Sequence, residues 1–213
     1  MKTNIKIIII GFIAIILSVL TAAYIIGDSV QVIIDPGHGG DDLGAVFNGR
    51  NEKDDNLKIA LLVKEKLDDM GISAELTRKS DKFISLEKRC KIANSGKAEL
   101  FVSLHRNSAE NANGVEIWIR NDSPQKDSEL AENILESLDK AGISLNRGVK
   151  AGYARENGQN YYVNTHTDMP SCLVELGFIN SETDNKLYDE KLEEYAEAIA
   201  NAIADNLKTA EAQ

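Results

Sequence analysis

The stretch VIIDPGHGG, from Val32 to Gly40, joins a run of strand-forming residues to a turn of proline, histidine and glycine. The run is apolar on both faces, which predicts a strand inside a covered sheet. The three glycines allow backbone dihedral angles that other residues avoid, and Pro36 stiffens the turn. We therefore expect this strand to deliver His38 to a loop at its carboxyl end, where open α/β sheets place their sites.

Strand and helix patterns alternate along the rest of the chain. We expect strands at 31–36, 72–78, 99–105, 114–120, 160–164 and 171–178, and helices at 56–71, 85–96, 127–142 and 191–208. This alternation predicts a single α/β domain, with a mostly parallel or mixed twisted sheet and helices on both faces. The segment between 99–105 and 114–120 is too short for a helical crossover, so we expect a mixed sheet.

The N-terminal segment differs in composition from the rest of the 213-residue chain. An uncharged, mostly apolar run at 7–26 follows Lys2 and Lys6, and it is long enough to span a bilayer. We therefore expect residues 1–29 to be a signal peptide or a membrane anchor, which leaves 30–213 as one extracytoplasmic domain, either membrane-anchored or secreted.

Charge and cysteine usage narrow the class of protein. The net charge of −10, without a basic stripe, argues against nucleic acid as a partner, so an anionic polymer would need a specific cleft. Export permits a disulfide between Cys90 and Cys172, but their helical and strand patterns favour two buried free thiols. The absence of a Cys-x-x-Cys pair excludes a structural zinc site built on thiolates.

The three histidines share a position near the ends of expected strands. His38 follows the first strand, His105 ends the strand at 99–105, and His166 follows the segment at 160–164. Because the carboxyl ends of strands form the sites of such sheets, this shared position indicates a function that none of the three would indicate alone.

Two carboxylates, Glu175 and Glu52, occur in contrasting sequence environments. Glu175 lies inside an apolar run, where a carboxylate needs an ion or a hydrogen-bond partner unless it faces outward from an edge strand. Glu52 precedes a helix, and its pattern is typical of a solvated first turn favoured by the helix dipole. Two histidines and one carboxylate, with a position left for water, form the ligand set of catalytic zinc, and a further carboxylate would act as the base. His38 and His105 with Glu52 or another acid could be the ligands.

Five motifs carry a resemblance to a known family. In chain order they are VIIDPGHGGDDLGAV, NEKDDNLKIA, SLHRNS, GVEIW and CLVELGFINSETD, and together they closely resemble the zinc-dependent N-acetylmuramoyl-L-alanine amidases of the Amidase_3 type. The resemblance implies that His38, Glu52 and His105 bind one Zn²⁺ and that Glu175 is the catalytic carboxylate. It also implies a bacterial cell-wall hydrolase that cleaves the amide between N-acetylmuramic acid and L-alanine of peptidoglycan.

Five further residues carry weaker expectations. We expect Asn107, His166 and Arg155 to contact substrate, with a loop or capping role as the alternative for His166. Asp35 either fixes the tautomer of a zinc-binding histidine or holds the turn through its own backbone. Arg106 stands where the family more often has a small residue, so we expect its long cation to affect which stem peptides fit.

Three other functions are compatible with parts of the pattern. A zinc peptidase or deacetylase would use the same metal chemistry on another wall amide, whereas a non-catalytic wall-binding protein should have lost one of the four key residues. The third is an enzyme that is inactive alone and whose zinc site is completed or exposed by a protein activator. No wall-binding module is evident, so we expect the membrane segment or a protein partner to localise the chain, in a spore-cortex or cell-separation role.

Overall fold

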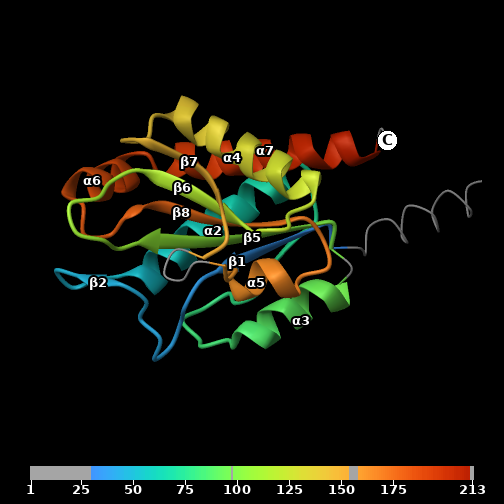
Figure 1. Cartoon of the computed structure of the whole chain (residues 1–213), viewed down its shortest axis with the longest axis horizontal. Coiled ribbons are helices and arrows are strands. Elements are labelled where there is room, and N and C mark those ends of the chain that lie inside the picture. The colour runs from blue at the N-terminus through green and yellow to red at the C-terminus, as the bar shows by residue number, and fades with distance from the viewer. Residues whose placement is uncertain (1–29, 97, 154–157, 212–213) are drawn as a thin grey trace, which may run out of the picture.

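A six-stranded sheet forms the centre of the protein, in the order β4-β1-β5-β8-β6-β7 (Figure 1). The structure, a computed structural model, describes residues 30–96, 98–153 and 158–211. The strands are β1 (Val32–Pro36), β4 (Ala74–Leu76), β5 (Leu100–Asn107), β6 (Val115–Ile119), β7 (Asn146–Ala151) and β8 (Ser171–Phe178). Strands β1, β4, β5 and β8 are parallel, whereas β6 runs antiparallel to β8 and parallel to β7. The predicted mixed sheet is therefore confirmed.

Helices cover both faces of this sheet (Figure 1). On one face the larger apolar cluster packs against α2 (Glu52–Asp69), α4 (Gln125–Ala141) and α7 (Leu192–Glu211). On the other face a smaller cluster packs against α3 (Leu86–Gly96) and α5 (Tyr162–His166). The remaining elements are α6 (Glu182–Glu190) and a hairpin of β2 (Val46–Phe47) and β3 (Arg50–Asn51).

Alternation along the strands decides which side chains reach which face. In β5, Leu104 packs in the larger cluster and Phe101 in the smaller one; in β8, Val174 and Leu173 divide in the same way. Because the side-chain period of a strand is two, His105 lies on the face of Phe101. The smaller cluster leaves space on this face beyond α3 and α5, and the cleft described below lies there.

Two expectations about the order of elements are wrong. Residues 162–166 form the helix α5 rather than a strand, and the hydroxyl of Thr165 donates back to the carbonyl of Tyr161 at 3.2 Å. The aromatic and β-branched residues of this segment favour a strand locally, but the segment packs beside α3 instead. Strand β7 was not expected, because Asn146–Ala151 contains a glycine and only one β-branched residue.

The predictions about the membrane segment and about the cysteines fare differently in the structure. Among the residues that the structure describes, no helix is both long and apolar enough to cross a membrane; the expected leader at 1–29 lies outside them. Cys90 and Cys172 are buried free thiols in different apolar clusters on opposite faces of the sheet. The prediction of two buried thiols is confirmed.

Candidate metal centre and cleft

Three side chains from separate parts of the chain converge at the carboxyl end of β1 and β5. His38 follows β1, Glu52 is the first residue of α2, and His105 lies in β5. Each offers one ligand atom, and these atoms lie within 4.8 Å of one another. His38 Nε2 and His105 Nδ1 lie 3.2 Å and 2.8 Å from Glu52 Oε1, so two nitrogens and one oxygen face a single point.

Backbone geometry holds this group together. His38 adopts φ = 60°, a left-handed conformation that turns the chain sharply after β1. Gly37 has no room for a side chain, because a Cβ atom there would lie 2.1 Å from Cε1 of His105. Glycine at position 37 is thus required by the close approach of the backbone to the His105 ring.

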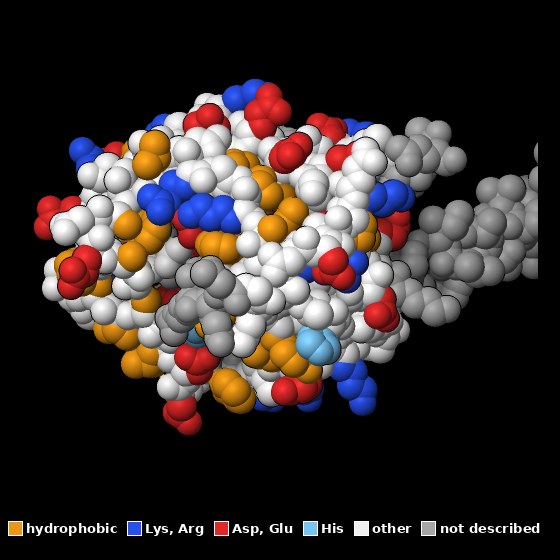
Figure 2. Space-filling view, viewed as in Figure 1, with side chains coloured by type: hydrophobic (Ala, Val, Ile, Leu, Met, Phe, Trp, Pro, Cys, Tyr) orange, Lys and Arg blue, Asp and Glu red, His pale blue; other side chains and the backbone are white. Residues whose placement is uncertain are grey.

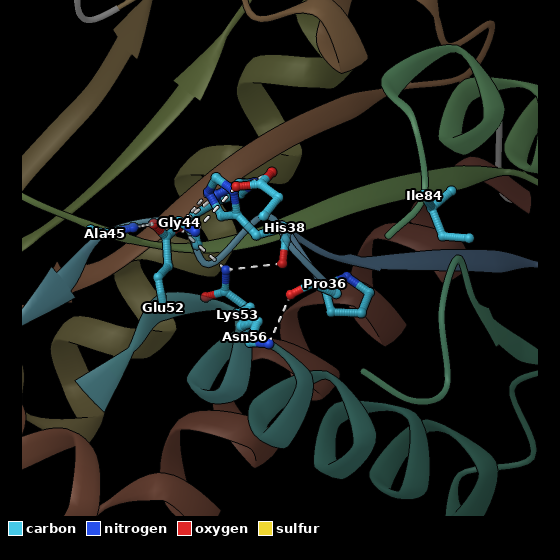
Figure 3. Close-up of polar contacts among 12 residues, drawn as sticks. Pro36, His38, Gly44, Ala45, Glu52, Lys53, Asn56 and Ile84 are labelled. Carbon is cyan, nitrogen blue, oxygen red and sulfur yellow. Dashed lines mark hydrogen bonds and ion pairs between the residues drawn. The ribbon is translucent and has the colours of Figure 1, made fainter. Parts of the chain in front are cut away.

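Glu52 is held by several donors. Its Oε2 accepts a hydrogen bond from the Ala45 amide at 2.8 Å (Figure 3). Its Oε1 accepts one from the Arg106 amide at 3.1 Å. Burial alone would raise the pKa of this carboxyl, but His105 and His38 lower it well below its usual range. A buried, ionised carboxylate beside two imidazoles is a donor set that Zn²⁺ prefers, so these residues fit the ion that the sequence implies.

Asp42 orients one of the histidines. Its Oδ2 lies 2.9 Å from Nδ1 of His38, so Nδ1 carries the proton and Nε2 faces Glu52. This carboxylate–histidine pairing fixes tautomer and ring orientation around bound metals. Asp42 was not predicted from the sequence, where Asp35 was the candidate for this role. The only signal for Asp42 was an acid four residues after His38 in a glycine-rich loop.

Asp35 has a structural role instead. Its side chain accepts hydrogen bonds from Thr77 at 2.5 Å, Arg89 at 2.7 Å and Ser103 at 2.8 Å. Burial raises the pKa of Asp35, but the Arg89 guanidinium and these hydrogen bonds lower it overall. Asp35 therefore ties β1 to β5 and α3 beneath the metal centre and orients no histidine.

Glu175 lies one strand away from His105. The two residues are paired neighbours in the parallel ladder of β5 and β8, and Glu175 is only 6% exposed. Because β8 lies between β5 and β6, the outward-facing edge position considered for Glu175 is wrong. Glu175 lines the same cleft as the three converging side chains, a hollow of about 1380 Å³.

The weaker site candidates have different outcomes. Asn107 and His166 both line the cleft; Asn107 donates to Glu116 at 2.9 Å, and His166 stacks on Tyr162 at 3.8 Å between ring centroids. Arg155 lies outside the described residues. Arg106 also borders the cleft, but its side chain makes its contacts on the opposite side of the sheet.

The side chain of Arg106 has no exposed surface with which to contact a stem peptide directly, contrary to the expectation that it affects which peptides fit. Its side chain is completely buried and donates to Asp55 and Asn185, each at 2.7 Å. The guanidinium also lies over the Tyr188 ring, 4.5 Å from its centroid. Arg106 follows His105 in β5, so the strand period of two turns it towards α2 and α6 instead of the cleft.

Comparison with known proteins relates this geometry to a family. The Amidase_3 family, described as N-acetylmuramoyl-L-alanine amidase, matches residues 32–208. The protein YqiI of Bacillus subtilis strain 168 is 40% identical over 179 residues, which are 83% of this chain and 82% of YqiI. The probable cell wall amidase LytH of Staphylococcus epidermidis is 34% identical over 182 residues, 83% of this chain but only 57% of LytH.

A solved structure has the same architecture. The CwlD amidase from Clostridioides difficile, determined in complex with the GerS lipoprotein, matches with a TM-score of 0.76 and 30% sequence identity. The match covers 85% of this chain and 100% of the CwlD chain. The chain described here therefore belongs to the N-acetylmuramoyl-L-alanine amidase family of the Amidase_3 type.

Proposed function

We propose that the protein is an extracytoplasmic peptidoglycan amidase that hydrolyses the bond between N-acetylmuramic acid and the first L-alanine of the stem peptide. His38, Glu52 and His105 would hold one Zn²⁺. The observation that carries the proposal is the convergence of these three donors within 4.8 Å, with Glu175 on the neighbouring strand. Membership of the amidase family supplies the substrate class.

The positions of the carboxylates suggest which one would bind the metal and which one would transfer protons. A zinc ion held by His38, Glu52 and His105 would supply positive charge to polarise the scissile carbonyl and to lower the pKa of water at the site to about 7. Because Glu52 faces both imidazoles, we assign the proton transfer to Glu175, which lies beside His105 on the neighbouring strand. Glu175 accepts a proton from the attacking water and donates it to the leaving amine of L-alanine.

Other residues of the cleft would bind the glycopeptide. Asn107 and His166 line the hollow that contains Glu175, and this supports a role for both in positioning the substrate. Arg155 is proposed as a further contact on the basis of its sequence segment alone. Localisation by the N-terminal segment and by a protein partner is also proposed, the latter because the related CwlD amidase was solved with a lipoprotein.

The test is product analysis with the full-length protein and a defined muropeptide. We expect new L-alanine amino termini without new reducing sugar ends, loss of cleavage with a zinc chelator, and recovery when zinc is added back. Glu175→Gln should abolish cleavage while zinc still binds, and Glu136→Gln, at an exposed glutamate of α4, should leave cleavage unchanged.

The same assay separates the competing activities. A deacetylase would release acetate, and a peptidase would cut the stem peptide without freeing its first amino terminus. Cleavage that survives both chelation and Glu175→Gln would overturn the proposed mechanism.

A further inference from the structure

Two cations line the same cleft on the side away from the metal centre. Arg147 and Lys150, both on β7, contribute to its wall, and their side chains are 30% and 32% exposed. Figure 2 shows Lys and Arg side chains gathered over β6 and β7, beside apolar ones. In a chain with a net charge of −10, a pair of cations in the substrate cleft calls for an explanation.

A β-bulge places both cations on this face. Val115 pairs with Asn146, and Ile117 pairs with Val149. Between these two pairs the chain moves on by two residues in β6 but by three in β7, so β7 contains one extra residue. Gly148 permits this with φ = 83°. Without the extra residue, positions 147 and 150 would point to opposite faces of the sheet. With it, the two side chains meet over the cleft.

One buried carboxylate anchors both cations. Glu116, in the GVEIW motif, accepts hydrogen bonds on Oε2 from Arg147 at 2.7 Å and from Lys150 at 2.6 Å. Its Oε1 accepts from Asn107 at 2.9 Å and from Trp118 at 3.0 Å. Burial raises the pKa of Glu116, but these partners lower it overall, so the carboxylate is ionised.

The charges of the cluster formed by Arg147, Lys150 and Glu116 do not cancel. Within the described part of the chain, Glu116 is the only carboxylate in ion-pair contact with Arg147 or Lys150, so two cations share one anion. Both oxygens of Glu116 are already used by donors. One positive charge of the cluster is therefore left to face the cleft, where it would attract an anionic group of a ligand.

The distance from the catalytic carboxylate limits what that group is. Glu116 and Glu175 are direct cross-strand partners, and β7 lies one strand further out. The side chains of both cations reach back to Glu116, which lies one strand spacing of about 5 Å from Glu175, so their charged groups lie about 5–10 Å from the catalytic carboxylate. An extended peptide advances about 3.3–3.6 Å per residue, so a group at this distance belongs to the second or third residue beyond the scissile amide.

We propose that Arg147 and Lys150 form a subsite for a free carboxylate on the second or third residue of the stem peptide. This inference rests on the proposed amidase function and adds the charge of the preferred substrate to it. Glu116 acts as a positioning residue that holds both cations over the cleft. The neighbouring Trp118 ring, 5.3 Å from Nζ of Lys150, shields that cation on one side.

The test uses two pairs of synthetic muropeptides and the full-length zinc-loaded protein. Within each pair the peptides differ only in whether one carboxylate, on the second or on the third residue, is free or converted to a carboxamide. We expect wild-type kcat/KM to be about tenfold or more higher for the free acid in one pair, mainly through KM, because charge-assisted hydrogen bonds are lost in the amide. The pair that responds identifies the residue.

Variants then locate the preference. Lys150→Met and Arg147→Gln should raise KM for the free acid towards that of the amide and leave the amide substrate nearly unchanged, whereas Lys150→Arg should retain the preference. Lys140→Met, which removes an exposed cation from the last turn of α4, is the matched control and should behave as wild type. Thermal unfolding checks that each variant is folded.

Two results would overturn the subsite. Equal wild-type kcat/KM for acid and amide in both pairs would do so without any variant. Variants that slow cleavage of acid and amide equally would show that the cations only brace the edge of the sheet. Failure to cleave any of the four peptides would instead reject the amidase function itself.

Discussion

Replacing Gly37 by alanine should displace His105 from the metal centre without unfolding the protein. A Cβ atom at position 37 would lie 2.1 Å from Cε1, 2.3 Å from Nε2 and 2.6 Å from Nδ1 of the imidazole. Ordinary contact begins at 3.4 Å, so the ring must retreat by about 1.3 Å. Bonds from zinc to histidine are about 2.0–2.1 Å long and tolerate deviations of about 0.2 Å. The displaced nitrogen is therefore lost as a ligand.

The size of the effect follows from the number of ligands. Changes in the outer shell of a zinc site alone cost about 10–100-fold in affinity, so losing one of three protein ligands should cost about 100-fold or more. Overpacking at this buried position should also lower the free energy of unfolding, by about 1–3 kcal/mol. Zinc affinity is measured by competition with a chromophoric chelator, and unfolding by urea titration of the metal-free protein.

Gly96→Ala is the matched control. Gly96 ends α3, and among the described residues outside its own helix turn no atom lies within 4 Å of the position of its added Cβ atom. This change should leave zinc affinity unchanged and stabilise the helix by up to about 1 kcal/mol. Wild-type zinc affinity in Gly37→Ala would refute the inference that glycine is needed at position 37 to admit the His105 ring.

Three further predictions concern charges around the metal centre. Asp42→Ala should lower zinc affinity about 10–100-fold without altering the fold, because His38 loses the partner of its Nδ1 proton; unchanged affinity by calorimetry would contradict this. Burial lowers the pKa of His38, but Glu52 and Asp42 raise it overall. Protons therefore compete with zinc for His38 at pH values above the ordinary pKa of histidine. Below the raised value, apparent zinc affinity should fall about tenfold for each pH unit, whereas a flat profile from pH 5 to 8 would count against His38 as a ligand. Asp35→Asn should lower the free energy of unfolding by about 3–5 kcal/mol at pH 7, because the buried Arg89 loses its anionic partner. Since the lowered pKa of Asp35 stabilises the fold above about pH 4 and this contribution is lost in stronger acid, the difference from wild type should shrink at pH 3; a constant difference in urea titrations would be inconsistent with an ionised Asp35.

Strand periodicity explains which parts of the site could be predicted. The runs at β1, β5 and β8 are apolar on both faces, so covered strands were recognisable, and polar residues at their ends stood out. His38, His105 and Glu175 were found in this way. Arg106 shows the converse error: it stands where the family more often has a small residue, which suggested an effect on the fit of stem peptides, but alternation along β5 turns its side chain to the other face.

Other parts of the site depend on contacts between distant segments. Glu52 and Asp42 have the local pattern of solvated acids, and only the packing of α2 and the His38 loop against β5 reveals their roles. The resemblance to a family identified Glu52 but not Asp42. Arg147 and Lys150 meet only because of a bulge in β7, a strand whose composition gives almost no strand signal.

All of the proposed chemistry depends on one divalent ion held between His38, Glu52 and His105. The most direct measurement is an anomalous difference map at the zinc absorption edge from crystals grown with zinc. We expect one peak, about 2.0–2.2 Å from Nε2 of His38, Nδ1 of His105 and a carboxylate oxygen of Glu52, with Glu175 close by but not bonded to it. A zinc peak at other residues, or an active crystalline enzyme without a peak between these three, would contradict the account.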